Sequence, residues 1–585
     1  MSALDFIKRH TGALHILVLA TLVPALYAGT LGYPWEFDDG KHILMNPAVR
    51  EARAIFDQDY ARSLGVEPLM ARVHQGRPLG FLSFNLSYRL SGYGPEAWRA
   101  VNIALHVGCT LVLYAFLRLL FGVLAPEWGG LAALWGAALF AAHPLATESV
   151  IYVAQRTNLM ASFFYLCALA SYLKWRLRGG RAFYALALMS VLASMLSKET
   201  GFTAPLAIML LELALTRSGA APRAERRQAL LALAPFALAL FVVPMRLVMY
   251  ALSRGGSAGL MEAVASSSTL MPEATRSQYM ATQSIVVFKY LWLLLWPSGM
   301  NVDYYFLPVA GFAQAQVLVS CLGHLGVLGA VAYTLLRSAE GGRGSGGLAR
   351  ALALLVLLYY LALSVESSVL PLKEMMVEYR TYLPGAFLLA ALAAAVASGL
   401  KYLWGRLDMR ALALAALVVA MAWPVGLAGA TYIRALAWKS EAALWVASLE
   451  ENPDNPRALN NLAVQYMNQG KDEGAIGLLE RSIIIKPDYA QTHRNLYLLY
   501  TRTGRYEAAE RGYRELLAHP VTDPDIYAGY GLLALKTGRA ALAVQMYTKY
   551  LSLRPGIAMV HRDRALAYRM LGNIPAAEAD EARAR

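Results

Sequence analysis

Long apolar runs dominate this chain and limit what it can fold into. Hydrophobic residues make up 57% of its 585 residues and charged residues only 16%, whereas a soluble domain carries about a quarter charged residues. A helix needs roughly 20 apolar residues to cross a bilayer. The sequence predicts an all-α, polytopic membrane protein, because runs that reach or approach this length occupy residues 12–31, 99–121, 129–142, 158–175, 182–196, 201–216, 229–251, 284–297, 315–336, 350–370, 381–400 and 411–430.

Basic loops between these runs predict the orientation of the chain in the membrane. Short loops rich in Lys and Arg stay in the cytoplasm, and here they occupy residues 174–181, 217–227, 337–350 and 401–410. With a cytoplasmic N-terminus, the loop at 337–350 is cytoplasmic only if the short, Trp-rich run 284–297 does not cross. We therefore predict eleven spans and one re-entrant or interfacial helix. Residues 32–98 then form the first extracytoplasmic loop, and the C-terminal region also lies outside.

The basic balance of the chain does not indicate nucleic-acid binding. The net charge of +14 comes from Lys and Arg residues that mostly lie in short loops, with no basic stripe interleaved with aromatics. Cys109, Cys167 and Cys321 lie inside apolar runs without metal-ligand spacing, and we interpret them as packing residues. The first run lacks a clear cleavage site and is interpreted as an uncleaved anchor. No metal site and no cofactor are predicted.

A 34-residue period marks the C-terminal region, which we take from residue 432. Glycine and alanine each hold one position of the repeat: Gly470, Gly504, Gly538 and Gly572, and Ala475, Ala509, Ala543 and Ala577. This pattern resembles the tetratricopeptide repeat, a helix–turn–helix unit with glycine in the turn. We predict a membrane domain over 1–431 and an extracytoplasmic helical solenoid over 432–585, whose concave face suits an acceptor protein or peptide. A solenoid that only braces the membrane domain is the alternative.

Paired acids follow the first apolar run at once. Asp38 and Asp39 lie in "YPWEFDDGKHILMNP". A carboxylate there can take a proton from a hydroxyl group, and a neighbouring carboxylate raises its proton affinity. The competing interpretation is a solvated Asp-Asp-Gly turn.

Other ionisable residues gather at the same predicted face of the membrane. They are Arg77, His143, Glu148, Arg156, Lys198, Glu199, Lys373, Glu374, Glu378 and Arg380. Ionisable groups near lipid are costly unless they are paired, hydrated or functional. Several loops that converge with both signs of charge indicate a site for an anionic lipid head group, although each residue alone is equally consistent with an interfacial anchor.

Six segments, followed by the repeats, resemble the transmembrane-and-tetratricopeptide-repeat protein O-mannosyltransferases of the GT-C fold. In order they are "FDDGKHILMNP", "RPLGFLSFNLSYRL", "WRAVNIALH", "HPLATESVIYVAQRTNLMASFFYL", "SKETGFTAPL" and "EYRTYLP". The resemblance runs from about residue 30 to the C-terminus. It implies a GT-C-type membrane bundle that moves a sugar from a polyprenyl-phosphate carrier to a hydroxyl acceptor outside the cytoplasm, with inversion.

The resemblance also implies roles for individual residues. Asp38 and Asp39 would include the catalytic base. The donor phosphate would be bound by Arg77, Lys198 and Arg380. The sugar would be bound, or the cations supported, by His143, Glu148, Arg156, Glu199, Glu378 and Tyr382. Arg and Lys can neutralise a leaving phosphate without a metal, and a divalent cation at Asp38, Asp39 and Glu148 is the alternative.

The short repeat array implies a bacterial member of the family, in the inner membrane, with the active site and the repeats on the periplasmic side. Its sugar need not be mannose. Two other functions remain open: a membrane-anchored repeat scaffold for an envelope assembly, and a transporter of the lipid-linked sugar. A scaffold needs only one anchor helix, and a transporter would place ionisable residues near the bilayer midplane. The many spans and the one-sided charges favour the enzyme.

Overall fold

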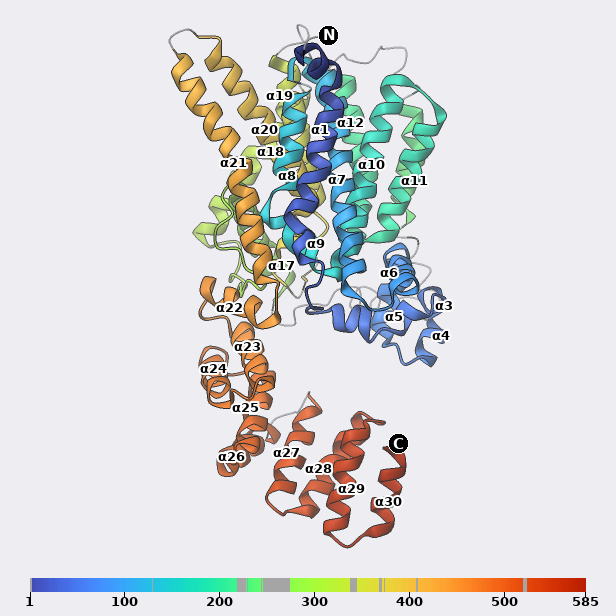
Figure 1. The fold of residues 1–585 in the computed structure, drawn as a ribbon, viewed down its shortest axis with the longest axis vertical. Coiled ribbons are helices and arrows are strands. Elements are labelled where there is room, and N and C mark those ends of the chain that lie inside the picture. The colour runs from blue at the N-terminus through green and yellow to red at the C-terminus, as the bar shows by residue number, and fades with distance from the viewer. Residues whose placement is uncertain are drawn as a thin grey trace. The chain divides into compact units, whose positions relative to one another are not determined.

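A computed structural model describes residues 3–128, 130–217, 228, 230–242, 245, 274–336, 345–367, 371–372, 374–406, 409–518 and 523–584. Every regular element in these ranges is a helix. The chain divides into two compact units (Figure 1). The first comprises residues 1–302 and 306–440, and the second comprises residues 303–305 and 441–585.

Long helices that run alongside one another build most of the first unit (Figure 1). The main helices of this unit are α1 (Ala3–Tyr27), α7 (Pro95–Leu124), α8 (Leu131–Ala141), α10 (Arg156–Arg178), α11 (Arg181–Ser197), α12 (Ala204–Arg217), α14 (Ala234–Ala239), α17 (Arg276–Leu295), α18 (Ala315–Leu336), α19 (Ser345–Leu363), α20 (Tyr382–Trp404) and α21 (Arg410–Ala437). Helix α10 packs between α7 and α11, and α20 packs against α8 and α19. Residue 431, the predicted end of the membrane domain, lies inside α21.

Seven helical segments in the described residues are long and apolar enough to cross a membrane. They are Thr11–Thr30, Pro95–Leu124, Glu199–Arg217, Ala315–Leu336, Gly346–Leu363, Glu378–Trp404 and Arg410–Ala437. Helix α17, which covers the run predicted to be re-entrant, is not among them. The helical membrane class is confirmed, whereas the count of eleven spans is not. Residues 218–227, 243–244, 246–251 and 337–344, which include most of two predicted basic loops and the end of the predicted run 229–251, lie outside the described residues.

The first loop folds into a small helical module. It contains the 3-10 helix η1 (Ala28–Thr30), the π-helix η2 (Gly40–Leu44), α2 (Pro47–Arg50), α3 (Arg53–Phe56), α4 (Gln58–Ser63), α5 (Pro68–Gly76) and α6 (Pro78–Ser91). Proline at the first position of α2, α5 and α6 suits the start of a helix, because its φ is already helical and its missing N–H would be unpaired there. The module has its own core, which includes Ile43, Val49, Ile55, Phe84 and Trp98.

Short elements join the long helices and carry most of the candidate site. They are η3 (Pro126–Trp128), η4 (Pro144–Ala146), α9 (Thr147–Ile151), η5 (Val153–Gln155), η6 (Glu199–Thr203) and η7 (Glu378–Thr381). Element η4 packs against η7 and α21, and η6 packs against α10 and α19. Only glycine fits at Gly201, because a Cβ there would lie 2.4–2.6 Å from the backbone of Ser194 and Met195. The "SKET" link can therefore turn tightly against α11.

The second unit confirms the predicted repeats. After α22 (Glu441–Glu451) it contains four helix pairs: α23 (Pro456–Asn468) with α24 (Asp472–Ile485), α25 (Ala490–Arg502) with α26 (Tyr506–Leu517), α27 (Asp525–Lys536) with α28 (Ala540–Leu553), and α29 (Ala558–Met570) with α30 (Ile574–Arg583). The repeat glycines lie between paired helices with φ from +72° to +81°, a conformation that favours glycine. The repeat alanines are all fully buried between the paired helices.

Candidate active site

The two adjacent aspartates have different environments. Asp38 is exposed, whereas Asp39 is fully buried. Oδ1 of Asp39 accepts the backbone N–H of Ala154 at 2.7 Å, and Oδ2 accepts the backbone N–H of Glu36 at 3.3 Å. Asp39 therefore ties the first loop to the segment that follows α9, while the carboxylate of Asp38 stays accessible.

Burial also changes the acidity of Asp39. It raises the pKa of this carboxyl group to about 7, although the N–H groups of Ala154 and Glu36 and the charge of Arg99 act in the opposite direction. Asp39 is therefore about half protonated near neutral pH.

An unusual backbone path presents Asp38. Phe37 has a φ of 48°, which residues other than glycine rarely adopt. Its ring contacts the rings of Tyr152 and Trp438, with centroids 5.8 Å apart in each pair. The hydroxyl of Tyr152 accepts the N–H of Asp38 at 3.0 Å, and the π-helix η2 begins directly after Asp39. Backbone strain and π-helical turns concentrate at functional sites.

Arg99, on α7, anchors the loop that carries the aspartates. Its guanidinium is buried and donates to the carbonyl oxygens of Leu31 and Ile151, each at 3.2 Å, and to those of Tyr33 and Pro34. An arginine that donates to four carbonyls fixes the start of the loop on the bundle. Sequence analysis missed this role, although a charged residue at the start of an apolar run in "WRAVNIALH" was a usable signal.

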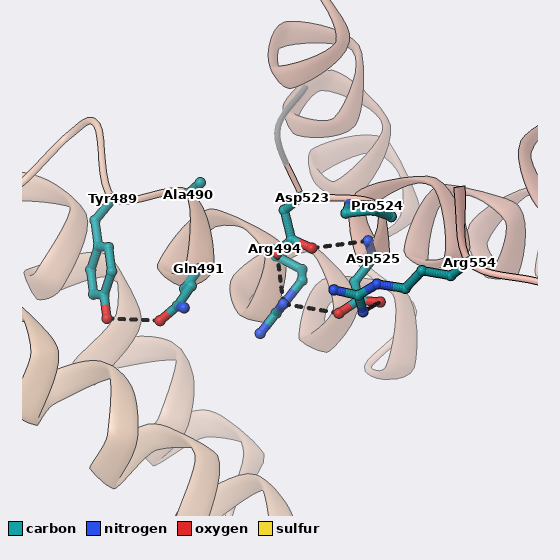
Figure 2. Close-up of a pocket in the computed structure, with 8 residues that line it drawn as sticks. All are labelled: Tyr489, Ala490, Gln491, Arg494, Asp523, Pro524, Asp525 and Arg554. Atoms are coloured by element: carbon teal, nitrogen blue, oxygen red, sulfur yellow. Dashed lines mark hydrogen bonds and ion pairs between the residues drawn. The ribbon is translucent and has the colours of Figure 1, made fainter. Parts of the chain in front are cut away.

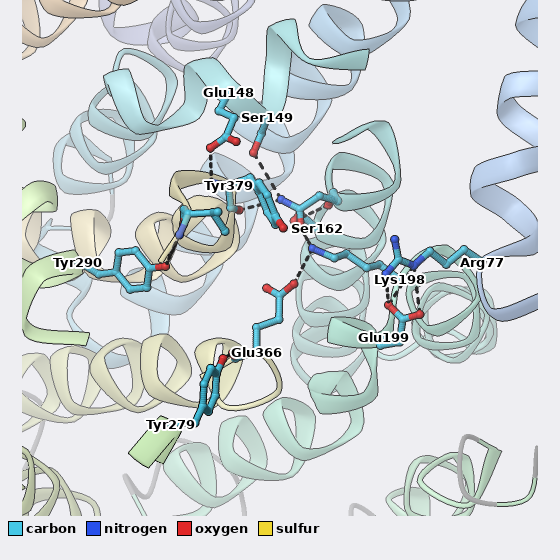
Figure 3. Close-up of polar contacts among 12 residues, drawn as sticks. Arg77, Glu148, Ser149, Ser162, Lys198, Glu199, Tyr279, Tyr290, Glu366 and Tyr379 are labelled. Atoms are coloured by element: carbon cyan, nitrogen blue, oxygen red, sulfur yellow. Dashed lines mark hydrogen bonds and ion pairs between the residues drawn. The ribbon is translucent and has the colours of Figure 1, made fainter. Parts of the chain in front are cut away.

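Two carboxylates hold two of the predicted phosphate-binding cations (Figure 3). The Nε of Arg77 donates to both carboxylate oxygens of Glu199, at 3.1 and 3.0 Å, and its Nη2 lies 2.9 Å from Oε2. The Nζ of Lys198 lies 2.8 Å from Oε1 of Glu366. The adjacent residues Lys198 and Glu199 therefore connect α6, by way of Arg77, with the turn that follows α19.

Lys198 makes two further contacts. Its Nζ donates to Oδ1 of Asn158 at 3.1 Å and lies 4.9 Å from the ring centre of Tyr379. Burial lowers the pKa of Lys198, and the charge of Glu366 opposes this shift. Lys198 is thus a desolvated cation with polar neighbours on several sides.

Arg380 completes the set of predicted cations. Its side chain is buried, and Nη1 donates to the carbonyl of Met375 at 3.4 Å. Its Nε is buried and has no hydrogen-bond partner among the described residues. The guanidinium lies within electrostatic range of Glu366. Lys373, which sequence analysis placed at this face, lies outside the described residues.

Two buried glutamates, Glu148 and Glu378, lie next to Tyr379. Oε2 of Glu148 accepts the N–H of Tyr379 at 3.0 Å (Figure 3). Both carboxylate oxygens of Glu378 accept from Nη2 of Arg434 at 3.2 Å. Burial raises the pKa of Glu148, and the nearby charge of Glu378 adds to this shift. Arg434, near the end of α21, was missed because a lone arginine at a helix end also reads as a topology signal.

His42 lies in the first loop, one turn after Asp38. Burial lowers the pKa of this histidine, the charge of Asp38 opposes the shift, and the charges of Arg77 and Lys41 add to it. His42 therefore lies within electrostatic range of both the exposed acid and the first cation. Sequence analysis did not single it out, although it comes one turn after Asp38.

Three residues that the sequence predicted for the site, Arg156, His143 and Tyr382, make their contacts elsewhere in the membrane unit. Arg156 is buried in the core of the first loop, where it donates to Asn102, Ser83, Ser87 and Trp98. His143 accepts the N–H of Leu145 and donates from Nε2 to the carbonyl of Leu294 at 3.2 Å. The hydroxyl of Tyr382 lies 2.6 Å from Nδ1 of His106. Their supporting role stays a prediction, and none of these contacts links them to Arg77, Lys198 or Arg380.

The described residues contain no group of three or more His, Cys, Asp or Glu side chains that could hold a metal ion. In the alternative cation set of Asp38, Asp39 and Glu148, both oxygens of Asp39 accept backbone N–H groups.

The repeats contain a pocket of about 400 Å³ (Figure 2). It lies where α25 and α27 begin, and it is lined by Tyr489, Ala490, Gln491, Arg494, Asp523, Pro524, Asp525 and Arg554. Arg494 pairs with Asp523 at 2.7 Å and with Asp525 at 3.2 Å, and Arg554 pairs with Asp525 at 3.1 Å. The pocket offers both signs of charge together with aromatic and amide groups.

Comparison with known proteins gives relatives over nearly the whole chain. Protein O-mannosyl-transferase TMTC3 of Mus musculus is 24% identical over 94% of this chain. Protein O-mannosyl-transferases Tmtc2 and Tmtc1 of Drosophila melanogaster are 36% and 35% identical over 35% and 32% of it. Its curated homologues are protein O-mannosyl-transferases. The chain spans 22%, 21% and 61% of the lengths of Tmtc2, Tmtc1 and mouse TMTC3, respectively.

Comparisons with family models and with solved structures add little to this result. No family model matches the chain. The crystal structure of MamA is 23% identical, with a TM-score of 0.23, and covers 24% of this chain and 84% of its own. A tetratricopeptide repeat protein from Parabacteroides merdae is 21% identical, with a TM-score of 0.22, and covers 32% of this chain and 71% of its own. TM-scores this low do not establish a shared fold.

Proposed function

We propose that this chain is a membrane glycosyltransferase that moves a sugar from a polyprenyl-phosphate carrier to a hydroxyl group of an extracytoplasmic protein. The observation that carries the proposal is the group of predicted cations: Arg77 pairs with Glu199 at 2.9 Å, Lys198 pairs with Glu366 at 2.8 Å, and the side chain of Arg380 is buried nearby. These cations, together with the exposed carboxylate of Asp38, are the combination that such a transfer needs. The names of the homologues support the same reaction class.

Arg77, Lys198 and Arg380 bind the phosphate of the donor. Guanidinium and ammonium groups donate strong hydrogen bonds to phosphate oxygens, and the buried Nε of Arg380 is a donor that such an oxygen can satisfy. When the bond between the anomeric carbon and the phosphate oxygen breaks, negative charge grows on the phosphate. Fixed cations in a dry site stabilise that charge.

Asp38 is the catalytic base, and Asp39 positions it. Asp38 is exposed, whereas both oxygens of Asp39 accept backbone N–H groups. The acceptor oxygen attacks the anomeric carbon on the face opposite the phosphate and gives its proton to the Asp38 carboxylate. The carbon–phosphate-oxygen bond breaks in the same step, the carrier phosphate leaves with the electron pair, and the sugar inverts.

The repeats bind the acceptor, and the site faces the periplasm of a bacterial inner membrane. Seven apolar segments and the positive loops between runs support the membrane orientation. The pocket lined by Tyr489, Arg494 and Asp525 offers donors and acceptors for an extended peptide. Glu199 holds Arg77 in place, and the buried carboxylates of Glu148 and Glu378 bind the sugar.

The base assignment is tested with Asp38→Asn and Asp39→Asn in the full chain. Asp38→Asn keeps the size of the side chain but removes the base, so we expect transfer to fall by about 10²–10⁴-fold with carrier binding unchanged. Intact mass of extracytoplasmic proteins from cells that express each variant measures the transfer. Asp39→Asn, which disturbs the position of the base without removing it, is expected to lower stability and to lower transfer less than Asp38→Asn does. A folded Asp38→Asn protein that leaves the sugar mass on every target contradicts the assignment.

A further inference from the structure

Glu366 is a carboxylate that no sequence motif marks, yet it pairs with Lys198, one of the three cations of the site. It follows α19 in a turn, and its carbonyl accepts the hydroxyl of Tyr279 at 2.8 Å. Its carboxylate lies 2.8 Å from Nζ of Lys198 and is only 14% exposed (Figure 3). Although burial acts to raise the pKa of Glu366, the charges of Lys198, Arg380 and Arg77 hold it below its usual range. Glu366 is therefore an anion that is paired with Lys198 and lies within electrostatic range of Arg380 and Arg77.

Two of the three cations are paired with carboxylates before any phosphate arrives. Arg77 pairs with Glu199 and Lys198 pairs with Glu366, and Arg380 lies within electrostatic range of Glu366. A sugar joined to a carrier by one phosphate is a phosphodiester with a single negative charge. A sugar joined by a diphosphate carries at least two. The diphosphate donor therefore meets the stronger repulsion from Glu366.

Glu366 also competes directly for the donors that phosphate needs. A phosphate oxygen that reaches Lys198 must displace Glu366 or lie beside it, and two anions at that distance repel each other strongly in a buried site. Glu199 is different, because its two oxygens form a bidentate pair with Arg77 at the edge of the module. The charge of Glu366 therefore weakens phosphate binding at Lys198 and Arg380.

We propose that Glu366 is a specificity-determining residue, which competes with the donor phosphate for Lys198 and Arg380 and makes the site prefer a carrier monophosphate over a carrier diphosphate. The proposal rests on the proposed function, in which these cations bind the carrier phosphate. In this proposal, the negative charge of Glu366 repels the diphosphate donor more strongly than the monophosphate donor and so excludes it.

The test measures binding of a short-chain prenyl-phosphate sugar (the monophosphate) and of the matching prenyl-diphosphate sugar (the diphosphate) to the full chain in lipid nanodiscs. Glu366→Gln keeps the length of the side chain and an oxygen that can accept from Lys198, but it removes the charge. We expect its Kd for the monophosphate to fall by about tenfold and its Kd for the diphosphate by about a hundredfold, because the repulsion scales with the charge of the ligand. The preference for the monophosphate therefore narrows by about tenfold.

Glu212→Gln is the matched control. Glu212 is a buried carboxylate paired with Arg176 at 3.0 Å on α12, outside the group of cations, and its substitution is expected to leave both Kd values unchanged. Glu366→Ala removes the charge together with the contact to Lys198, and we expect it to shift both Kd values in the same direction as Glu366→Gln. It replaces that variant if Glu366→Gln does not fold.

The outcomes separate this inference from the proposed function. Folded Glu366 variants with both Kd values within twofold of the wild type, or with weaker monophosphate binding, overturn the role of Glu366 and leave the donor site intact. A wild-type protein that binds neither prenyl phosphate overturns the donor site itself, and the role of Glu366 with it.

Discussion

At the scale of residues, burial separates carboxylates that look alike in the sequence. Asp38 is exposed and Asp39 is fully buried, although they are adjacent. Glu366 is paired with a cation, whereas Glu148 lies beside a second glutamate. These environments push the pKa values in opposite directions: burial and like charge raise the pKa of Glu148, while the cations lower that of Glu366. The proposed roles follow from these differences.

Asp39 gives the protein a pH-dependent stability. Its pKa is about 7 in the folded chain against an ordinary value of 3.8, so the folded state holds the proton more tightly. The stabilisation is fully present below about pH 4 and is lost as the pH rises to about 7, a fall on the order of 4 kcal/mol. We expect the melting temperature to decrease between pH 4.5 and pH 7.5, and to decrease less in Asp39→Asn, which cannot titrate. Asp38→Asn should keep the wild-type slope, and an equal slope in all three proteins would contradict the assignment.

Single residues also show where sequence reasoning stops. The face that gathers Arg77, Lys198 and Arg380 was predictable from topology and motifs, because ionisable residues at helix ends near lipid are rare. The partner of Lys198 was not, since Glu366 follows a distant helix and carries no motif. Arg156 has the same charge as Arg77, yet its donors all serve the core of the first loop. Residue type alone cannot distinguish an arginine that stabilises the fold from one that binds a ligand.

At the scale of elements, the repeats were more predictable than the membrane spans. A repeat position that must be glycine is fixed by local backbone geometry, so Gly470 and its equivalents marked every turn between paired helices. A span depends on length, hydropathy and its neighbours together. Helix α10 carries charged residues at both ends and α17 is flanked by polar loops, and neither is among the seven apolar segments. The predicted number of spans therefore depended on length, hydropathy and neighbouring segments together, rather than on local backbone geometry.

Two glycines in the repeats respond oppositely to the same substitution. Gly504 has a φ of +81°, whereas Gly477 lies within helix α24 with open space around it. Gly504→Ala should destabilise its repeat by about 1–2 kcal/mol because alanine disfavours the left-handed conformation. Gly477→Ala should stabilise α24 by about 0.5–1 kcal/mol because alanine is the better helix former.

Hydrogen exchange of the full chain measures both effects. We expect faster amide exchange in α25 and α26 for Gly504→Ala, and slower exchange in α24 for Gly477→Ala. If both variants change exchange in the same direction, the turn geometry assigned to the repeat glycines is wrong.

At the scale of the whole molecule, the chain combines a helical membrane unit with a unit of helical repeats. The order of motifs along the sequence was the strongest sign of this combination, and protein O-mannosyl-transferase TMTC3 of Mus musculus is similar over 94% of the chain. The membrane unit holds the acids and cations of the candidate site at the ends of its helices, and the repeat unit holds a separate pocket of its own. This division suits an enzyme whose donor is a lipid and whose acceptor is a protein.

In the proposed reaction, Asp38 faces a sugar whose carrier phosphate is bound by Arg77, Lys198 and Arg380. Electron cryo-microscopy of the full chain in nanodiscs with a prenyl-phosphate sugar tests it most directly. The account predicts phosphate density within hydrogen-bond distance of Lys198 and Arg380, and the sugar between that phosphate and Asp38. Phosphate density bound away from these cations, or a sugar out of reach of Asp38, would contradict it.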